Sequence, residues 1–421
     1  TYQSYLMTDS IDSQITHASR QSGTAKACSI ERNDEHDCTI SEEPIAEQQA
    51  SDLAVKAATK ILERMQSRSN IFKKHREAKV PRIYRKDTIL GDLLGSGGFC
   101  NVYGVKQLNI KLNDVPDATN RNCIDSKRYV IKCLSPSTMS TSHSFETGAA
   151  DLVAEAMFLS SLEHPNIIKI QGVSSQGLSG FASGLERGFF IVLERIETTM
   201  KERMKMWELR HQHRRGSGFR QILPSKSEKL RQRKDFLERL NCAVEICAGL
   251  KYLHSCGILF RDIKPGNIGF DYNGNVKIFD FGFARELDHQ DLVQDDLYNL
   301  TGFVGTPRYM APEVASYEPY NLSADVYSFS VLLWSICSIQ VPFYGLSKEK
   351  HHDFVVKGSR RPSLDTSWSS SLRSLMTLGW SKELEKRPQM SYCYFILQNE
   401  ISLLQDGDEV HSGKARRRFS I

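Results

Sequence analysis

Hydrophobic positions divide the chain into a polar beginning, a strand-rich middle and a helix-rich second half. Residues 1 to about 50 are rich in Ser, Thr, Gln, Asp and Glu and show no sustained periodicity, so we expect them to be largely disordered. From Ser51 to about Lys79, apolar residues return at the i, i+3, i+4, i+7 spacing of one helix face. The residues that set this spacing are Ala58, Ile61, Leu62 and Met65. We therefore predict a helix ahead of the first strand.

Short apolar runs bounded by polar residues predict strands in the middle of the chain. These runs are Ile89–Leu94, Val102–Lys106, Tyr129–Leu134, Ile167–Val173 and Phe189–Glu194. One helical pattern, Asp151–Glu163, interrupts them. From Asp235 onward the pattern is mainly helical, and the predicted helices are Phe236–His254, Ser323–Cys337, Ser371–Trp380 and Ser391–Leu404. A strand-rich half followed by a helix-rich half predicts an α+β chain of two lobes.

The composition is ordinary for a globular protein and excludes few functions. Of 421 residues, 40% are hydrophobic and 25% are charged, which is enough chain for two packed lobes. The net charge of +5 is a mild excess, so we do not expect a nucleic-acid partner. The most apolar run, Ser328–Cys337, is shorter than the roughly 18 residues that a membrane span needs, so we expect no such span.

The cysteines and the N-terminus bear on location. Ten cysteines are scattered, without a C-x-x-C pair or a Cys/His cluster at zinc-ligand spacing. This pattern indicates reduced thiols, and we expect a cytoplasmic location, with the nucleus as the alternative. The N-terminus has neither a basic start nor an apolar core, so no signal peptide is visible. Because the first residue is Thr1 rather than Met, we expect a piece of a longer protein, in which a targeting segment could lie upstream.

Two polar insertions interrupt the pattern. Asn109–Lys127 separates the second and third predicted strands. Met200–Asp235 carries twelve Lys or Arg residues against four Asp or Glu residues. Such a high density of positive charge favours a segment that is solvated or bound to a partner over one that is packed in a core. One interpretation is therefore an anionic partner at residues 200–235, and the other is a solvated face.

A glycine-rich turn joins the first two predicted strands. It reads Gly95-Ser96-Gly97-Gly98-Phe99-Cys100-Asn101-Val102. Glycines let the backbone approach phosphates and present amides to an anion, although a plain hairpin turn explains them equally well. About thirty residues later Lys132 lies near the end of an apolar strand, where it is either an edge residue or a cation aimed into a cleft.

The next helical segment favours the second interpretation of Lys132. Glu155 lies on the apolar face of this segment, where a carboxylate without a partner is costly. That face is formed by Leu152, Ala156, Leu159 and Leu162. Lys132 is the natural partner, and an ion pair with Glu155 would orient the lysine towards phosphate oxygens. A surface Glu on an amphipathic helix is the alternative.

Together these segments resemble the small lobe of the protein kinase family. The turn is similar to G-x-G-x-x-G-x-V, residues 129–132 to V-x-I-K, and residues 155–167 to a helical Glu followed by L-x-x-L-x-H-P-N-I. The resemblance implies the bilobal, α+β protein kinase fold. The implied divisions are an N-terminal extension (1–86), a kinase domain (87–404) with a small lobe (87–196) and a large lobe (197–404), and a basic tail (405–421).

The resemblance also implies ATP as the phosphate donor, with Mg²⁺ as its metal and Mn²⁺ as the alternative. Leu193 takes the place of the gatekeeper, and Glu194–Ile196 that of the hinge that binds adenine. Gly269 stands where the family presents a large aliphatic floor, and Val130 is larger than the usual alanine of the roof, so we hypothesise that bulk has moved from floor to roof. The implied nucleotide-binding residues are Gly95, Ser96, Gly97, Gly98, Phe99, Cys100, Val102, Val130, Lys132, Glu155, Leu193, Glu194, Ile196 and Gly269.

Residues 258–267 resemble the kinase catalytic loop, H-R-D-L-K-x-x-N. Phosphoryl transfer needs an acceptor for the substrate proton, a cation near the γ-phosphate and a metal ligand, and Asp262, Lys264 and Asn267 supply these roles. Asp280-Phe281-Gly282 follows the next strand, and its Asp280 would be the second metal ligand. The predicted catalytic residues are thus Asp262, Lys264 and Lys132, and the predicted metal ligands are Asn267 and Asp280.

The segment Gly305–Glu313 resembles the substrate-positioning loop of protein kinases, which implies a protein substrate. In the family Glu313 would pair with Arg387, and Asp325 would brace the catalytic loop; we assign both a structural role. Lys264 and the pair Gly305-Thr306 resemble the serine/threonine pattern, so we expect transfer to Ser and Thr hydroxyls. The large-lobe helix that begins near Asp325 resembles the tyrosine-kinase-like group, so dual specificity stays open.

Two departures from the family pattern, together with the basic insertion at residues 200–235, raise the alternative of a pseudokinase that binds nucleotide or acts as a scaffold. Phe260 replaces the usual His or Tyr of the catalytic loop, and Cys100 replaces the third glycine of the turn. We expect Phe260 to pack beneath Phe281 in a column with Leu159 and Ile170. The thiol of Cys100 is either redox-sensitive or a small-residue substitution without a function. A complete set of charged catalytic residues favours activity.

Regulation has two interpretations. Tyr298 and Thr301 are candidate phosphoacceptors whose phosphate could bind Arg261, beside the catalytic Asp262. Alternatively, an unmodified carboxylate of the same segment pairs with Arg261. The candidates are Asp288, Asp291, Asp295 and Asp296. The sequence gives no indication of the oligomeric state, so we make no prediction about it.

Overall fold

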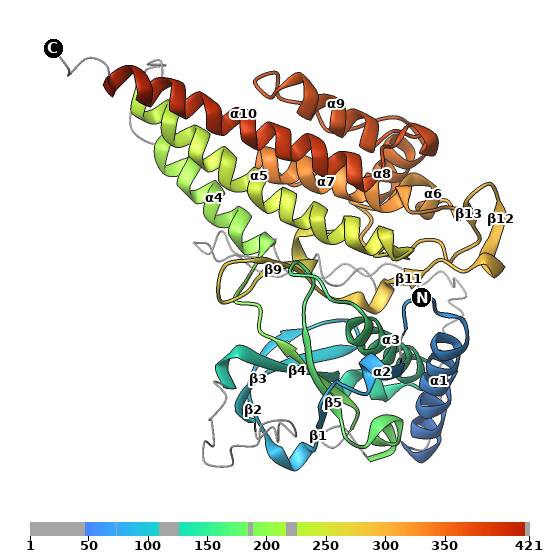
Figure 1. Ribbon diagram of the computed structural model, residues 1–421. Helices are drawn as coiled ribbons and strands as arrows, with labels where there is room; N and C mark the ends of the chain where they lie inside the picture. The colour runs from blue at the N-terminus through green and yellow to red at the C-terminus, as the bar shows by residue number, and fades with distance from the viewer. Residues whose placement is uncertain (1–46, 73, 109–125, 184–187, 216–224, 417–421) are drawn as a thin grey trace, which may run out of the picture.

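A computed structural model describes residues 47–72, 74–108, 126–183, 188–215 and 225–416. These residues form two lobes, with a strand-rich lobe built from the first part of the chain and a helical lobe from the second (Figure 1). The predicted α+β organisation is thus confirmed. The polar beginning, residues 1–46, and most of the polar insertion at Asn109–Lys127 lie outside the described residues, as does the end of the tail.

The small lobe is built around a six-stranded sheet in the order β1-β5-β6-β4-β3-β2. Its strands are β1 (Arg82–Ile83), β2 (Thr88–Ser96), β3 (Cys100–Leu108), β4 (Tyr129–Leu134), β5 (Ile170–Ser174) and β6 (Phe190–Glu194). All neighbours are antiparallel except β1 and β5. The strand predicted from Ile167 begins at Ile170, because Ile167 forms an isolated bridge with Ile278 of the large lobe instead.

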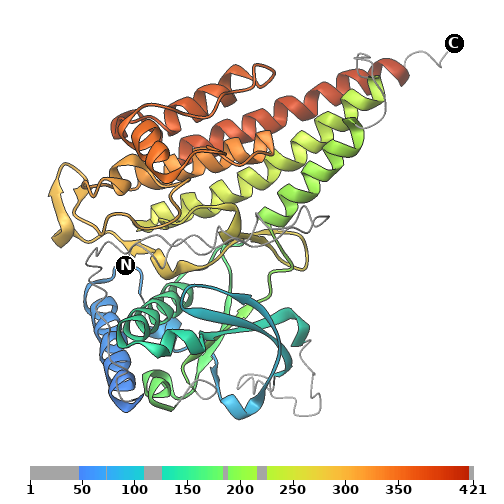
Figure 2. The same cartoon turned by 180° about the vertical axis from the view of Figure 1, so that it is seen from behind.

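Two long helices cover the small lobe on one side. α3 (Ser142–Ser161) begins nine residues before the predicted Asp151, since Thr141 caps it and Phe145 and Ala149 are buried in the core. α1 (Glu47–Arg68) lies alongside α3 in both views (Figures 1 and 2). The predicted helix to about Lys79 ends earlier, and only a short turn of helix, α2 (Lys74–Glu77), follows it.

The large lobe is mainly helical. Its helices are α4 (Met200–Arg215), α5 (Lys226–Ser255), α6 (Pro312–Ala315), α7 (Ser323–Ser338), α8 (Lys348–His351), α9 (Ser370–Gly379) and α10 (Met390–Arg416). α7 runs through the middle of the lobe, and nearly every residue from Ala324 to Cys337 is buried. This burial explains the most apolar run of the sequence as a core helix.

Short strand pairs position the loops between the lobes. β9 (Ile268–Phe270) pairs with β10 (Val276–Ile278) and β7 (Thr198–Thr199). β8 (Ile258–Leu259) pairs with β11 (Arg285–Glu286), and β12 (Leu292–Gln294) pairs with β13 (Leu297–Tyr298). The pairing of β8 with β11 joins the chain before the catalytic loop to the chain after Asp280.

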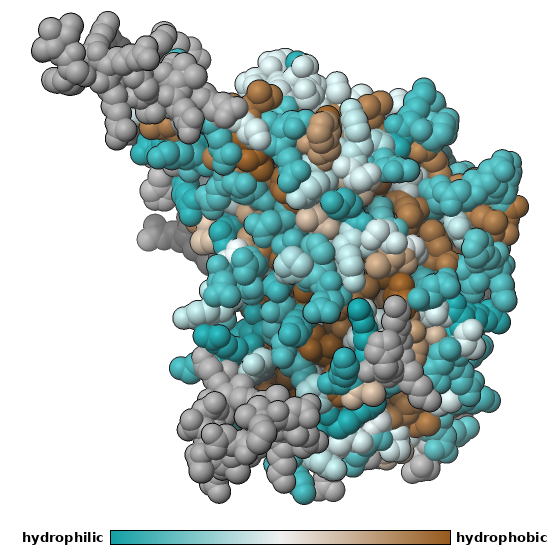
Figure 3. Space-filling view, in the orientation of Figure 1, coloured by the Kyte–Doolittle hydropathy of each residue, from teal (hydrophilic) through white to brown (hydrophobic). Residues whose placement is uncertain are grey.

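The surface seen in Figure 3 is mostly hydrophilic, with hydrophobic residues in separate patches. In the part of the chain that the structure describes, we find no helix with the length and apolar character of a transmembrane segment.

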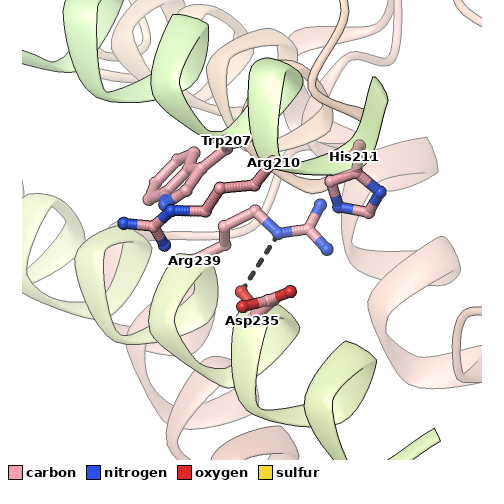
Figure 4. A pocket seen from close by; sticks show the side chains of 5 residues that line it. All are labelled: Trp207, Arg210, His211, Asp235 and Arg239. Carbon is pink, nitrogen blue, oxygen red and sulfur yellow. Dashed lines mark hydrogen bonds between the residues drawn. The ribbon is translucent and has the colours of Figure 1, made fainter. Parts of the chain in front are cut away.

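The basic insertion is largely helical where the structure describes it. α4 and the first turns of α5 project from the large lobe beside the end of α10 (Figure 1). Met200 and Trp207 are buried, so part of this insertion packs against the lobe. Trp207, Arg210, His211, Asp235 and Arg239 line a shallow surface depression between α4 and α5, which is too small to hold a ligand (Figure 4). An anionic partner for this insertion stays a prediction.

Candidate active site

The glycine-rich turn between β2 and β3 is a tight hairpin whose backbone is open on one side. The Gly97 amide donates to the Cys100 carbonyl at 2.8 Å. The Phe99 carbonyl accepts from Thr138 Oγ1 at 2.6 Å, which ties the tip of the turn to the chain after β4. A Cβ placed on Gly98 would meet no atom within 4 Å. The turn therefore has the space and the amides that an anion needs.

Lys132 in β4 bridges two carboxylates. Its Nζ lies 2.6 Å from Oε2 of Glu155 in α3 and 2.8 Å from Oδ1 of Asp280. Glu155 is 1% exposed, and its Oε1 has no hydrogen-bond partner among the described residues. The ion pair expected between strand and helix is present, so the interpretation of Glu155 as a surface residue is wrong.

Burial and charge oppose each other in this cluster. Burial lowers the pKa of Lys132, but Asp280 and Glu155 outweigh it, and the pKa lies well above its usual value. Lys132 lowers the pKa of Asp280. Burial raises the pKa of Glu155 against the pull of Lys132. The site therefore holds a fixed positive charge next to an ionised Asp280 carboxylate.

The chain crosses between the lobes at residues 194–197. The amides of Arg195 and Glu197 each donate at 2.8 Å, one to a carbonyl of the small lobe and one to a carbonyl of the large lobe. Within the described residues no acceptor is found for the Ile196 amide between them. The Ile196 amide is therefore available to donate a hydrogen bond to the edge of a nucleobase, while the hydrogen bonds of its two neighbours fix the backbone. This arrangement fits the predicted hinge role of Glu194–Ile196.

Gly269 in β9 does not leave a gap in the floor of the site. A Cβ at this position would lie 2.3 Å from Ile196 Cγ2 and 3.0 Å from Phe279 Cε1. These two side chains fill the volume that a larger residue would take. Ile196 and Phe279 thus supply bulk at the floor of the site, and the further exchange of bulk with Val130 in the roof stays a hypothesis.

We expect Gly269→Ala to destabilise the protein by about 1–3 kcal/mol, because the added methyl overpacks against Ile196. Combining it with Ile196→Ala should restore most of the loss, as measured by urea unfolding. Gly98→Ala is the matched control, since its methyl meets no atom within 4 Å. An equal effect of the two single substitutions would contradict the packing argument.

Three side chains hold the Asp262 carboxylate, which is 2% exposed. Lys264 Nζ lies 2.8 Å from Oδ2, Asn267 Nδ2 donates to Oδ2 at 2.8 Å, and Thr306 Oγ1 donates to Oδ1 at 2.8 Å. Because Asn267 uses its nitrogen here, its amide oxygen remains available as a metal ligand. The structure thus brings together the three residues predicted for the catalytic loop.

The predicted metal ligands, Asn267 and Asp280, would suit a cation that is only partly held by protein. Within the described residues no group of three or more His, Cys, Asp or Glu side chains could hold a metal by itself. Mg²⁺ keeps several waters and also binds substrate phosphates, so the Asn267 amide and the Asp280 carboxylate can be enough. Asp280 has a left-handed backbone, with φ at 68°, a strained conformation of the kind found at functional sites.

A buried carboxylate fixes the backbone of the catalytic loop. Asp325, at the start of α7, accepts from the Phe260 amide at 2.7 Å and from the Arg261 amide at 2.9 Å. The Phe260 ring meets the Phe281 ring edge-on, with centroids 5.2 Å apart, and both rings are fully buried. The expected packing of Phe260 beneath Phe281 is present, so Phe260 fills this space as a hydrophobic residue.

The family profile of the protein kinase domain matches residues 90–395. This match covers most of the chain. The chain belongs to the protein kinase family.

Several kinases are similar to this one over part of its length. The cAMP-dependent protein kinase type 3 of Saccharomyces cerevisiae is 40% identical over 144 residues, 34% of this chain and 34% of that protein. The serine/threonine/tyrosine-protein kinase HT1 of Arabidopsis thaliana is 32% identical over 168 residues, 40% of this chain and 41% of that protein. The tyrosine-protein kinase Fer of Homo sapiens is 25% identical over 322 residues, 76% of this chain and 31% of that protein.

This kinase therefore spans less than half of the length of these relatives. Their names include serine/threonine and tyrosine kinases, so the family match alone does not decide the residue that is phosphorylated. Nothing in these similarities supports the pseudokinase alternative.

The large lobe of the kinase contains the predicted anchor of its substrate-positioning loop. Glu313 in α6 accepts two hydrogen bonds from Arg387, at 2.6 and 2.9 Å. Arg387 also donates to the backbone carbonyls of Ser381 and Ser323. The pair therefore joins α6, the start of α7 and the chain before α10.

The acidic residues after Asp280 do not all pair with Arg261. Asp288 and Asp291 form ion pairs with arginines of α1, and Asp291 also pairs with Arg285. Arg261 instead donates to the Phe283 carbonyl and the Tyr320 hydroxyl. For Asp288 and Asp291 the predicted pairing with Arg261 is therefore wrong.

The two candidate phosphoacceptors differ in exposure. Thr301 is exposed, whereas Tyr298 is buried in β13. Thr301 is thus the more accessible of the two, and phosphorylation of either stays a prediction.

Two residues near the site received no role from the sequence. The sequence pattern gives Thr306 only a part in specificity, yet its hydroxyl contacts the Asp262 carboxylate. Asp151 lies one turn before Glu155 on α3, and burial together with Asp280 raises its pKa to about 7. The i, i+4 spacing from Glu155 is the signal that could have found Asp151.

The thiol of Cys100 is an inert part of the turn. Cys100 is buried, and burial raises the pKa of its thiol. A thiol without thiolate character is a poor target for oxidation, which favours the small-residue interpretation over the redox one.

Proposed function

We propose that this kinase transfers the γ-phosphoryl group of ATP to Ser and Thr hydroxyls of protein substrates. The observation that carries the proposal is the pair of contacts to Asp262, from Lys264 on one carboxylate oxygen and from Thr306 on the other. These two residues belong to the serine/threonine pattern. The contact of the Thr306 hydroxyl with Asp262 supports the proposal, because a substrate Ser or Thr hydroxyl needs the same distance to this carboxylate.

The side chains of the site divide the work of this reaction. When bound, ATP supplies the phosphoryl group and Mg²⁺ spreads its negative charge. Lys132, held by Glu155, donates to phosphate oxygens, and Asn267 and Asp280 offer oxygen ligands to the metal. Asp262 orients the substrate hydroxyl and accepts its proton.

Radiolabelled phosphate transfer from ATP to generic protein substrates tests this proposal, with Asp262→Asn as the comparison. We expect transfer by the wild-type chain with label on Ser or Thr, and a loss of about 10²- to 10⁴-fold in the variant, because the amide cannot accept the proton. Equal transfer by the two chains would contradict the role of Asp262. Label on Tyr alone would overturn the specificity, and label on all three residues would show dual specificity.

Location and partners are also proposals. Each of the seven cysteines that the structure describes is a free thiol, which supports a cytoplasmic location, with the nucleus as the alternative. An anionic partner at residues 200–235 is supported by their charge alone.

A further inference from the structure

Helix α1 packs against the helix that carries Glu155, although it lies outside the matched kinase domain. Ala54 and Ala58 of α1 are fully buried, and Ile61 and Leu62 pack against the same core as α3. Small residues at the contact let the two helices approach closely. Figures 1 and 2 both show α1 running along α3 at the edge of the small lobe.

The residues after α1 reach the segment that follows Asp280. Ser69 Oγ donates to Glu286 Oε2 at 2.5 Å, and the Asn70 amide donates to Glu286 Oε1 at 2.7 Å. Both oxygens of one carboxylate are thus bound by residues more than 200 positions away in the sequence. Hydrogen bonds to a charged acceptor are the stronger kind.

Ion pairs extend this contact along the same segment. Arg64 lies 3.5 Å from Asp291, and Arg68 lies 3.9 Å from Asp288. Arg285 lies 2.6 Å from the same Asp291 oxygen. An exposed pair stabilises little alone, but Arg64 and Arg285 share one Asp291 oxygen, and these pairs add to the hydrogen bonds that Glu286 accepts from Ser69 and Asn70.

The contacted strand leads directly to the catalytic loop. Glu286 lies in β11 and pairs with Ile258 of β8, four residues before Asp262. On the other side, β11 follows Asp280-Phe281-Gly282 by two residues. Residues 47–72 therefore contact α3, which carries Glu155, and β11, whose pairing with β8 joins the chain just before Asp262 to the chain just after Asp280.

We propose that residues 47–72, which we call the N-terminal brace, position the catalytic residues of this kinase. The brace holds α3 and β11 together in the arrangement in which Lys132 contacts both Glu155 and Asp280. Arg64, Arg68 and Ser69 are its positioning residues, since they contact neither the nucleotide-binding nor the catalytic side chains. The inference rests on the phosphoryl transfer proposed above.

The test reverses the charge of the brace in the full chain with Arg64→Glu/Arg68→Glu. We expect kcat to fall by about 5-fold or more, which corresponds to about 1 kcal/mol of lost transition-state stabilisation, with a smaller change in KM for ATP. Amide hydrogen exchange of β11 should be faster. The matched control is Arg82→Glu, which breaks an exposed ion pair of the small lobe with Glu77, and its kcat and β11 exchange should stay near those of the wild type.

A charge swap separates positioning from stability. Arg68→Glu/Asp288→Arg should have a higher kcat than Arg68→Glu alone, because the pair is restored in reverse. The proposal is overturned if Arg64→Glu/Arg68→Glu leaves both kcat and the β11 hydrogen exchange at the values of the control. It is also overturned if the kcat of Arg68→Glu/Asp288→Arg is no higher than that of Arg68→Glu. A wild-type chain without transfer would refute the proposed function instead, and β11 exchange would then decide the brace on its own.

Discussion

Replacing Lys132 with Met is expected to lower kcat by about 10²- to 10³-fold, the usual effect of removing one charge-stabilising donor. The lysine contacts Glu155 and Asp280 at 2.6 and 2.8 Å and is the link between them. Without it Glu155 is a buried carboxylate with no counter-charge. Burial already raises the pKa of Glu155, and the loss of the Lys132 charge raises this pKa further, which favours the protonated form of the side chain.

The measurement is steady-state phosphate transfer together with nucleotide binding. Lys277→Met is the matched control, because Lys277 has nearly the same exposure and also pairs with two carboxylates, Glu194 and Asp271. Its substitution should affect kcat much less, since it does not contact Asp280. A Lys132→Met variant with kcat near that of the wild type, or a Lys277→Met variant that is equally impaired, would refute the role of Lys132.

The residues of the catalytic loop could be predicted because their signals are local. Asp262, Lys264 and Asn267 lie within six positions of each other, and a short polar loop between apolar runs limits where their side chains can go. The pair of Lys132 and Glu155 was predictable for another reason, since a carboxylate on an apolar helix face needs a partner. The local sequence pattern and the free-energy cost of burying a charge were sufficient to predict these residues.

Contacts between distant segments could not be predicted in this way. The packing of Ile196 into the place of a side chain at Gly269 depends on how the hinge meets β9. The contact of Ser69 with Glu286 spans 217 positions, and the local sequence around either residue does not predict it. The early start of α3 was missed because Gly148 and its polar neighbours weaken the helical pattern, whereas close packing of that turn favours the helix.

Replacing Glu313 with Ala is expected to lower the free energy of unfolding by about 3–5 kcal/mol, because it leaves the Arg387 guanidinium buried without its counter-charge. The side chain of Arg387 is 0% exposed and that of Glu313 is 3% exposed, so water cannot replace the lost carboxylate. The two hydrogen bonds that bind Arg387 to backbone carbonyls hold its guanidinium in place and do not neutralise it.

Urea unfolding of the full chain measures this loss as a lower midpoint at an unchanged slope. The control is Asp353→Ala, which removes the partner of Lys357 in an ion pair whose side chains are 66% and 59% exposed. That substitution should change the free energy of unfolding by less than about 1 kcal/mol, since water screens both charges. If Glu313→Ala costs no more than this control, then the buried pair does not anchor the large lobe, and the role given to Glu313 is wrong.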